Sequence, residues 1–140
     1  MKTLIIYYSY SGKTKQFAQN LADKEFPDAD IMEIKDVRRP GKVKAYVRGC
    51  FAAIRGKSWQ IESLDKDLSL YSKLILLFPI WAGNVPPAFN SLISQLPENN
   101  TIIIKAISAS GKSDCKVRLE SIMTAKNCTI ESFEDIKISR

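Results

Sequence analysis

Histidine is absent from this 140-residue sequence. The Ser-His and Cys-His pairs of many nucleophilic enzymes are therefore excluded, and so is the commonest general base for neutral pH. No pair of acidic residues stands out as a substitute. We therefore expect a bound cofactor to supply any chemistry, and no side chain is predicted to be catalytic.

Cysteine is also scarce. The three cysteines, Cys50, Cys115 and Cys128, are odd in number and widely spaced, with no C-x-x-C pair among them. Without histidine they cannot complete a common zinc site, so no metal ligands are predicted. We expect buried or half-buried free thiols in a reducing compartment.

Long apolar runs are missing as well. No run approaches the roughly 20 residues of a membrane-spanning helix. Met1-Lys2 leads directly into a predicted strand rather than into a signal peptide. We therefore expect a cytoplasmic protein, and the length of residues 1–140 suits a single domain with its own core.

Positive charge is concentrated in one stretch. The formal net charge is +6, and residues 35–57 hold one acid, Asp36, among the basic residues Lys35, Arg38, Arg39, Lys42, Lys44, Arg48, Arg55 and Lys57. Apolar residues recur at helical spacing from 43 to 54, which predicts a helix that Gly56 ends. On it, Lys44, Arg48 and Arg55 share one stripe. This stripe is either a solvated helix face or a docking surface for an anionic partner or cofactor group.

Apolar stretches and helical patterns alternate along the chain. Strands are predicted at residues 3–8, 30–34, 74–78, 101–107 and within 129–138. Helices are predicted at 13–25, 43–54, 86–96 and 115–123. The unbroken apolar run at 74–78 is typical of a central parallel strand, whereas the alternation at 30–34 indicates an edge strand. The order predicts an α/β fold with a doubly wound five-stranded parallel sheet and helices on both faces.

Polar loops that contain glycine follow three of the predicted strands, at residues 9–14, 79–84 and 108–113. In parallel sheets, ligands bind beyond the carboxyl ends of the strands. We therefore expect the three loops to gather at one end of the sheet. The first loop leads directly into a helix, whose unpaired N-terminal N–H groups suit a phosphate.

Common nucleotide motifs do not fit these loops. Residues 12–14 end like the triphosphate loop G-x-x-x-x-G-K-[ST], but Tyr7 stands where that motif requires glycine. Residues 111–113 fail in the same way, with Ala106 at the glycine position. The dinucleotide fingerprint G-x-G-x-x-G is absent.

The loops resemble those of the flavodoxin family. Residues 9–14 match the family's phosphate loop, [ST]-x-[ST]-G-x-T, and residues 79–87 are similar to its second loop, P-x-W-x-G followed by prolines. Residues 46–57 are similar to a basic helix found in one branch of short flavodoxin-like proteins. The resemblance spans nearly the whole chain, and it implies the strand order 2-1-3-4-5 and FMN as the cofactor.

The resemblance and the chemistry of the loops together predict an FMN site. Hydroxyl and N–H groups of the first loop would hold the phosphate, with Gly12 permitting close approach. Trp81 would offer a flat surface to the flavin ring, and the small residues of the third loop would leave room for it. The predicted cofactor-binding residues are Ser9, Tyr10, Ser11, Gly12, Lys13, Thr14, Pro79, Ile80, Trp81, Ala82, Gly83, Asn84, Ser108, Ala109, Ser110 and Gly111.

The chain departs from the family's pattern at two places. The third loop lacks the second aromatic residue that often sandwiches the flavin, which would leave one face of the ring open to a substrate or partner. Many carrier flavodoxins are acidic, whereas residues 35–57 are basic. The partner would then be an acidic redox protein or a cofactor phosphate, with nucleic acid the weakest candidate.

Three functions remain as alternatives. The resemblance implies first an electron-transfer protein that works between redox partners. The second is an FMN-dependent NAD(P)H:quinone or flavin reductase, since the basic helix could receive the phosphates of a nicotinamide cofactor. The third is a binding module of the same fold that has lost the flavin.

No helix is predicted after the last strand. One side of the sheet should then expose an apolar face, which is unfavourable by roughly 25 cal/mol per Å². We therefore expect either a truncated sequence or a second copy of the chain over this face, as in a homodimer.

Overall fold

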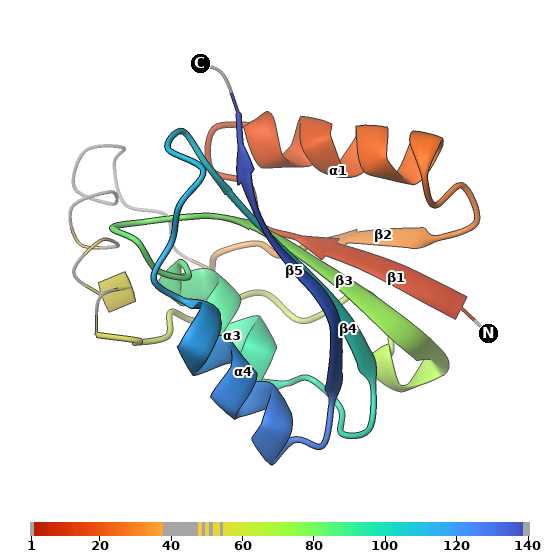
Figure 1. The fold of residues 1–140 in the computed structure, drawn as a ribbon. Helices are drawn as coiled ribbons and strands as arrows, with labels where there is room; N and C mark the ends of the chain where they lie inside the picture. The colour runs from red at the N-terminus through yellow and green to blue at the C-terminus, as the bar shows by residue number, and fades with distance from the viewer. Residues whose placement is uncertain (1, 38–47, 49, 51, 54, 139–140) are drawn as a thin grey trace.

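The computed structural model describes residues 2–37, 48, 50, 52–53 and 55–138, and its centre is a five-stranded sheet (Figure 1). Every strand pairs in parallel with its neighbours, in the order β2-β1-β3-β4-β5. The predicted fold and strand order are therefore confirmed, with strand ends that shift by a few residues. The strands are β1 (Lys2–Tyr7), β2 (Asp30–Glu33), β3 (Tyr71–Pro79), β4 (Thr101–Ser108) and β5 (Thr129–Lys137).

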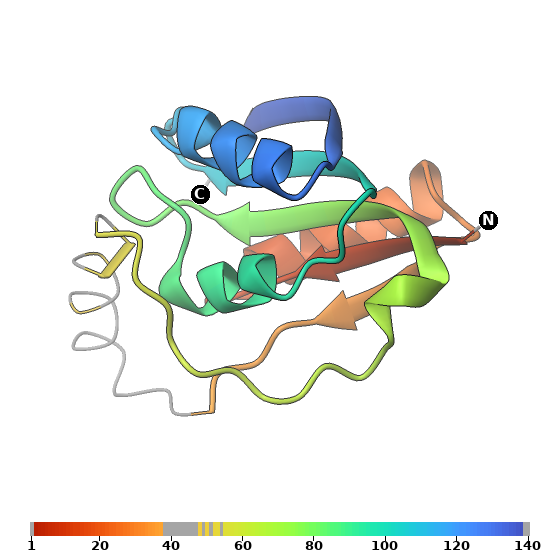
Figure 2. The same ribbon diagram turned by 90° about the horizontal axis from the view of Figure 1, so that it is seen from below.

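Helices cover both faces of the sheet. Helix α1 (Lys13–Lys24) lies on one face, and α3 (Pro87–Ser94) and α4 (Lys116–Ala125) lie on the other (Figures 1 and 2). A short 3-10 helix (Leu68–Leu70), which was not predicted, leads into β3. Within the described residues, none of the helices is long and apolar enough to cross a membrane.

Most of the predicted second helix falls outside the described residues, although residues 48, 50, 52 and 53 are helical. The predicted end at Gly56 is confirmed. Gly56 has a φ of 65°, its N–H donates to the Ala53 carbonyl at 3.0 Å, and the Lys57 N–H donates to the Ala52 carbonyl at 2.9 Å. This bond pattern around a left-handed glycine terminates helices.

Each face of the sheet has its own core. Side chains alternate along β1, so Leu4 and Ile6 pack on the side of α3 and α4, while Ile5 and Tyr7 face α1. All four are at most 5% exposed. Residues 74–78 of β3 are fully buried, as predicted for a central strand.

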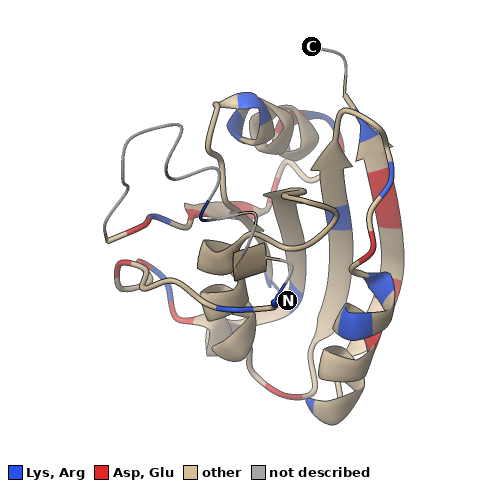
Figure 3. Ribbon diagram, turned by 90° about the vertical axis from the view of Figure 1, so that its left-hand side faces the viewer, with Lys and Arg blue, Asp and Glu red and all other residues tan. Residues whose placement is uncertain are grey.

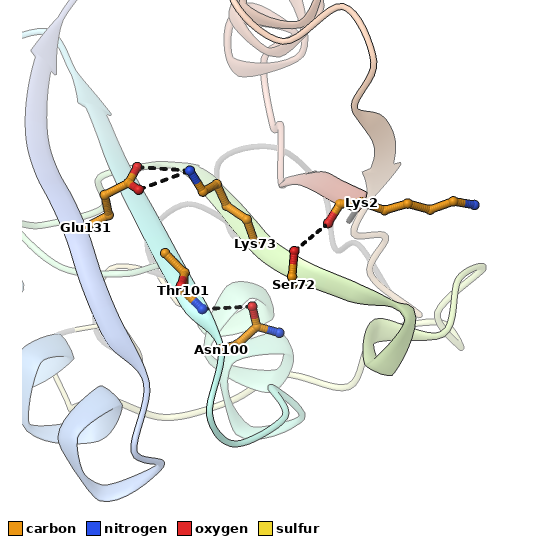
Figure 4. Close-up of polar contacts among 6 residues, drawn as sticks. All are labelled: Lys2, Ser72, Lys73, Asn100, Thr101 and Glu131. Atoms are coloured by element: carbon orange, nitrogen blue, oxygen red, sulfur yellow. Dashed lines mark hydrogen bonds and ion pairs between the residues drawn. The ribbon is translucent and has the colours of Figure 1, made fainter.

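The sheet face beside α1 is not the open apolar surface that the sequence predicted. Two ion pairs reach β5 from other strands. Lys73 Nζ of β3 lies 3.0 Å from Glu131 Oε1, and Lys105 Nζ of β4 lies 2.8 Å from Glu134 Oε1; Figure 4 shows the first pair. Lys105 is only 7% exposed, so its hydrocarbon stem is buried. The exposed large apolar residues of the described chain lie elsewhere: Val37, Leu70 and Val117. The second copy expected over this face stays a prediction.

Residues 35–37 and 60–62 form a short antiparallel ribbon. Two main-chain hydrogen bonds of 2.8 and 3.2 Å join them. The Tyr8 hydroxyl, just past β1, donates to Asp36 Oδ2 at 2.8 Å. The ribbon therefore fixes both ends of residues 38–59 beside the carboxyl end of the sheet.

Candidate binding site

The three predicted loops meet at the carboxyl end of the sheet, which Figure 3 turns toward the viewer. A cavity of about 240 Å³ opens between them, and nine of the predicted site residues line it. Sequence reasoning missed Ile107 and Ile138, which add an apolar wall. The lining residues are Tyr10, Ser11, Lys13, Thr14, Pro79, Ile80, Trp81, Ile107, Ser108, Ala109 and Ile138.

The first loop presents unpaired N–H groups where α1 begins. Gly12 precedes the helix with a φ of 96° and has no side chain to cap it. Its own N–H donates to Ser9 Oγ at 3.0 Å, which closes the loop into a tight turn. Within the described chain, the N–H groups of Lys13, Thr14 and Lys15 have no acceptor. These donors are available to a ligand at the helix end.

The electrostatics of this helix end favour an anion. The first turn of α1 carries Lys13 and Lys15 and no acidic residue. Cations near the positive end of a helix dipole are unfavourable unless a negative group is bound there. Thr14 is 3% exposed, lines the cavity, and its hydroxyl has no hydrogen bond to any other described residue. The N–H groups, the lysines and this hydroxyl together fit a phosphate.

Trp81 is the centre of an aromatic cluster beside the cavity. Its ring meets Tyr10 edge-on at a centroid distance of 5.5 Å, and Tyr8 and Trp59 at 6.0 Å each. Only 3% of Trp81 is exposed. The flat surface that the sequence predicted is therefore covered in this arrangement, and a flavin ring could stack on it only if a neighbouring ring moved.

The second loop turns at Ala82 and Gly83. Two hydrogen bonds of 2.9 and 3.0 Å between Trp81 and Asn84 close the turn, and Ala82 and Gly83 have φ values of 50° and 82°. This is the geometry of a type I′ turn. The Asp114 N–H donates to the Gly83 carbonyl at 2.7 Å, so the turn is bound to the start of the α4 region.

The third loop is held by its own hydroxyls. The Gly111 N–H donates to Ser108 Oγ at 2.9 Å, and the Ser113 hydroxyl donates to Asp135 Oδ1 at 2.5 Å. The Ile138 N–H donates to the Ser108 carbonyl at 3.0 Å, which brings the end of β5 to the cavity. The alternation of β5 is the one sequence signal that could have placed Ile138 there, on the same side as Ile136.

Seven predicted site residues stay outside the cavity lining. Ser9 and Gly12 shape the first loop, and Gly111 shapes the third. The others are Ala82, Gly83, Asn84 and Ser110. Of the predicted anion-docking residues, Lys44 lies outside the described chain, while Arg48 and Arg55 are exposed.

A larger hollow of about 670 Å³ lies at the opposite end of the sheet, where the strands begin. Its polar groups are largely engaged with one another (Figure 4). Asn100 Oδ1 accepts from the Thr101 N–H at 2.9 Å, and Lys73 is paired with Glu131. The unpaired donors of the first loop therefore make the carboxyl end the better candidate site.

The strand order and the loops at the carboxyl end define a flavodoxin-like α/β fold. Solved structures agree. The chain is similar to a flavoprotein from Lactobacillus acidophilus NCFM in complex with FMN, with a TM-score of 0.73 and 22% identity over 94% of this chain and 91% of that one. The apo form of that flavoprotein gives a TM-score of 0.68 at 22% identity, covering 95% and 91%. Oxidised flavodoxin 2 from Bacillus cereus gives 0.58 at 14% identity, covering 99% and 86%.

No protein-family model and no curated protein matches the chain.

Proposed function

We propose that the protein binds FMN in the three-loop cavity and transfers electrons between redox partners. The observation that carries this proposal is the start of α1, where unpaired N–H groups, Lys13 and the Thr14 hydroxyl lie at a cavity with an apolar and aromatic wall. A ligand with a phosphate joined to an aromatic ring matches this arrangement, with the phosphate at the helix start and the ring against the wall. The likeness in fold to an FMN-bound flavoprotein supports the same assignment.

The residues divide by the part of FMN that they suit. Ser11, Thr14 and the N–H groups of the first helical turn would hold the phosphate. Ile80 would meet the ring, and so would Trp81 once a neighbouring aromatic ring had moved. The small residues Ser108 and Ala109 would leave space for it. When bound, the flavin supplies the redox chemistry, and the chain supplies binding, orientation and shelter from water.

The absorbance spectrum of the purified protein tests the cofactor assignment. A yellow protein, or a colourless one that quenches the fluorescence of added FMN, is the expected result. A colourless protein that does not quench FMN would instead support the third alternative, a binding module without flavin.

A pair of threonine variants tests the site itself. Thr14→Val should weaken FMN binding by about 1–2 kcal/mol, roughly tenfold, because one hydrogen bond to the phosphate is lost. Thr124→Val is the matched control, since Thr124 is exposed on α4 and its hydroxyl donates to the Glu120 carbonyl at 2.8 Å. Equal affinity of the two variants, measured by fluorescence titration, would show that the phosphate lies elsewhere.

The reductase remains the second candidate, favoured by the exposed Arg48 and Arg55. Such an enzyme would take electrons from NAD(P)H and deliver them to a quinone or a second flavin. Anaerobic addition of NADPH to the FMN-loaded protein decides between the two candidates. Rapid bleaching of the yellow colour indicates the reductase, and no bleaching indicates the carrier.

A further inference from the structure

We propose that an acidic redox protein docks on an arginine patch, which we define as Arg48, Arg55, Lys57 and Arg118. This proposal rests on the proposed FMN binding, because it names the partner of that site. Three members of the patch, Arg55, Lys57 and Arg118, adjoin at the end of the 48–56 segment. A Cβ on Gly56 would lie 3.4 Å from Arg118 Nε, so Arg118 meets the chain between Arg55 and Lys57.

The geometry of the patch is fixed by described contacts. Arg118 Nη2 donates to Asn90 Oδ1 at 3.0 Å, and Asn90 Nδ2 donates to the Lys57 carbonyl at 2.9 Å. Arg48 belongs to the helical part of this segment, and Arg55 lies in the turn that ends it. Arg48, Arg55 and Lys57 are exposed.

The charge of the patch is not neutralised within the described chain. The two ion pairs there, Lys73–Glu131 and Lys105–Glu134, lie between strands of the sheet and include no patch residue. The acidic residues nearest to Arg118 in the sequence are Glu120, which is exposed on α4, and Asp114, whose carboxylate lies against Gly83. Figure 3 shows Lys and Arg in blue at the start of α4, at the carboxyl end of the sheet. Concentrated charge of one sign attracts a partner of the other sign.

Trp59 connects this patch with the cavity. It follows Lys57 by two residues, and its ring meets that of Trp81, which lines the cavity, at a centroid distance of 6.0 Å. Its main chain is anchored to α3, because its N–H donates to the Pro87 carbonyl at 3.1 Å and its carbonyl accepts from the Ser91 hydroxyl. A protein docked on the patch would therefore lie next to the aromatic cluster that borders the flavin.

The pattern suits a protein surface better than a single phosphate group. A phosphate site gathers its donors at one point, as the first loop does. The patch instead spreads its cations over two separate segments of the chain, with Arg48, Arg55 and Lys57 exposed and Arg118 half-buried. This arrangement fits an extended acidic surface. Rim charges of this kind govern the association rate and its salt dependence more than the final affinity.

Electron transfer to two haem proteins of opposite charge tests the proposal. The FMN-loaded protein is reduced and mixed with an acidic b-type cytochrome or with basic mitochondrial cytochrome c. One electron passes from the reduced protein to the ferric haem, which becomes ferrous and is followed by absorbance. The rate with the acidic cytochrome should fall about tenfold as salt rises from low to physiological ionic strength, and the rate with the basic one should rise.

Charge reversal on the patch should remove this preference. Arg48→Glu with Arg55→Glu should slow the acidic cytochrome about tenfold at low salt, while Lys24→Glu, at the far end of α1, should change the rate by less than about twofold. Unchanged electron-transfer rates in the double variant would overturn the docking proposal. A double variant whose only change is weaker binding of NADPH would overturn it too. A protein that binds no FMN would instead refute the proposed function, and absorbance before mixing distinguishes the two failures.

Discussion

At the scale of single residues, Gly83 is the described glycine at which an added Cβ would make the closest contact. Its φ is 82°, and a Cβ there would lie 2.6 Å from Asp114 Oδ2. We predict that Gly83→Ala lowers the free energy of unfolding by about 1–3 kcal/mol, because the new methyl group adds a clash to the strain of a left-handed conformation. Urea denaturation without FMN measures the loss.

Gly12 is the matched control for this prediction. Its φ of 96° imposes the same kind of strain, but a Cβ there would meet nothing within 4 Å. Gly12→Ala should therefore cost about 1 kcal/mol, from backbone strain alone. Combining Gly83→Ala with Asp114→Ala should recover the part of the loss that comes from the clash. If both glycine variants lose the same stability, the contact with Asp114 is unimportant.

The cysteines differ in accessibility, as the sequence predicted in outline. Cys115 and Cys128 are buried and Cys50 is half-buried, all as free thiols. Burial raises the pKa of the Cys115 thiol, so less of it is the reactive thiolate at neutral pH. We predict that iodoacetamide labels Cys50 first and leaves Cys115 unmodified in the folded protein. Mass spectrometry of partial digests checks the order, and rapid labelling of Cys115 would contradict it.

At the scale of elements, the two ion pairs beside α1 cover part of the sheet face that no helix of the described chain covers. Lys105 has a side chain that is 9% exposed, whereas that of Glu134 is 55% exposed. The buried stem of Lys105 should therefore matter more to stability than the ion pair, since half-exposed pairs contribute little.

Two variants of Lys105 separate packing from charge. Lys105→Met keeps the length of the stem and should stay within about 1 kcal/mol of the parent protein. Lys105→Ala removes the stem from the sheet and should lose about 1–3 kcal/mol. Urea denaturation midpoints report both values, and equal losses would show that the ion pair carries the contribution.

A second link between elements joins β3 to β2 across β1. The Tyr71 hydroxyl donates to Asp30 Oδ2 at 2.7 Å. This hydrogen bond, with burial and the carboxylate charge, raises the pKa of Tyr71 from 10.0 to about 12. Because the fold favours the protonated hydroxyl, the stabilisation is complete below pH 10 and is lost as the pH rises toward about 12.

Tyr71→Phe isolates this effect. The difference in stability between parent and variant should be constant below about pH 10 and should shrink above it. Urea denaturation of both proteins is measured at several alkaline pH values. The difference between parent and variant at each pH removes the titration of lysines and other tyrosines, which both proteins share. Parallel curves over the whole range would show that the link to Asp30 does not control stability.

Sequence patterns predicted elements better than the contacts between them. Alternating strands and helices determine the parallel sheet, and the loops after strands determine which end binds a ligand. The pairs Lys73–Glu131 and Lys105–Glu134 escaped prediction because they depend on the register of β5, which shifts between Ile102 and Ile103. Periodicity within one strand contains no information on that register.

In the candidate site, too, consecutive residues were easier to predict than contacts between distant ones. The residues of the phosphate loop are consecutive, so their chemistry could be read from the sequence. The aromatic cluster combines Tyr8, Trp59 and Trp81 from three distant parts of the chain, and the burial of Trp81 follows only from their assembly. The sequence predicted a flat face of Trp81 that was open to the flavin, because no local pattern shows that aromatic rings from distant parts of the chain cover it.

At the scale of the whole molecule, we propose that the chain is one domain whose stability depends on FMN. A ligand that binds only the folded state adds about 2.7 kcal/mol at a concentration one hundred times its dissociation constant. We predict that FMN raises the melting temperature by several degrees in a single transition. Riboflavin, which lacks the phosphate, should have a much smaller effect in the same calorimetric experiment. Equal shifts would show that the first loop does not bind the phosphate.

The short ribbon of residues 35–37 and 60–62 also bears on how this chain can vary. It holds the two ends of residues 38–59 side by side by main-chain hydrogen bonds, so the length between them is not constrained by the sheet. Insertions are tolerated where the ends of a segment are already close together. Relatives of this protein could therefore differ in length and charge within this segment, apart from Ala53 and Trp59, which pack into the core. A flavodoxin-like scaffold would in this way acquire new partners without rebuilding its strands.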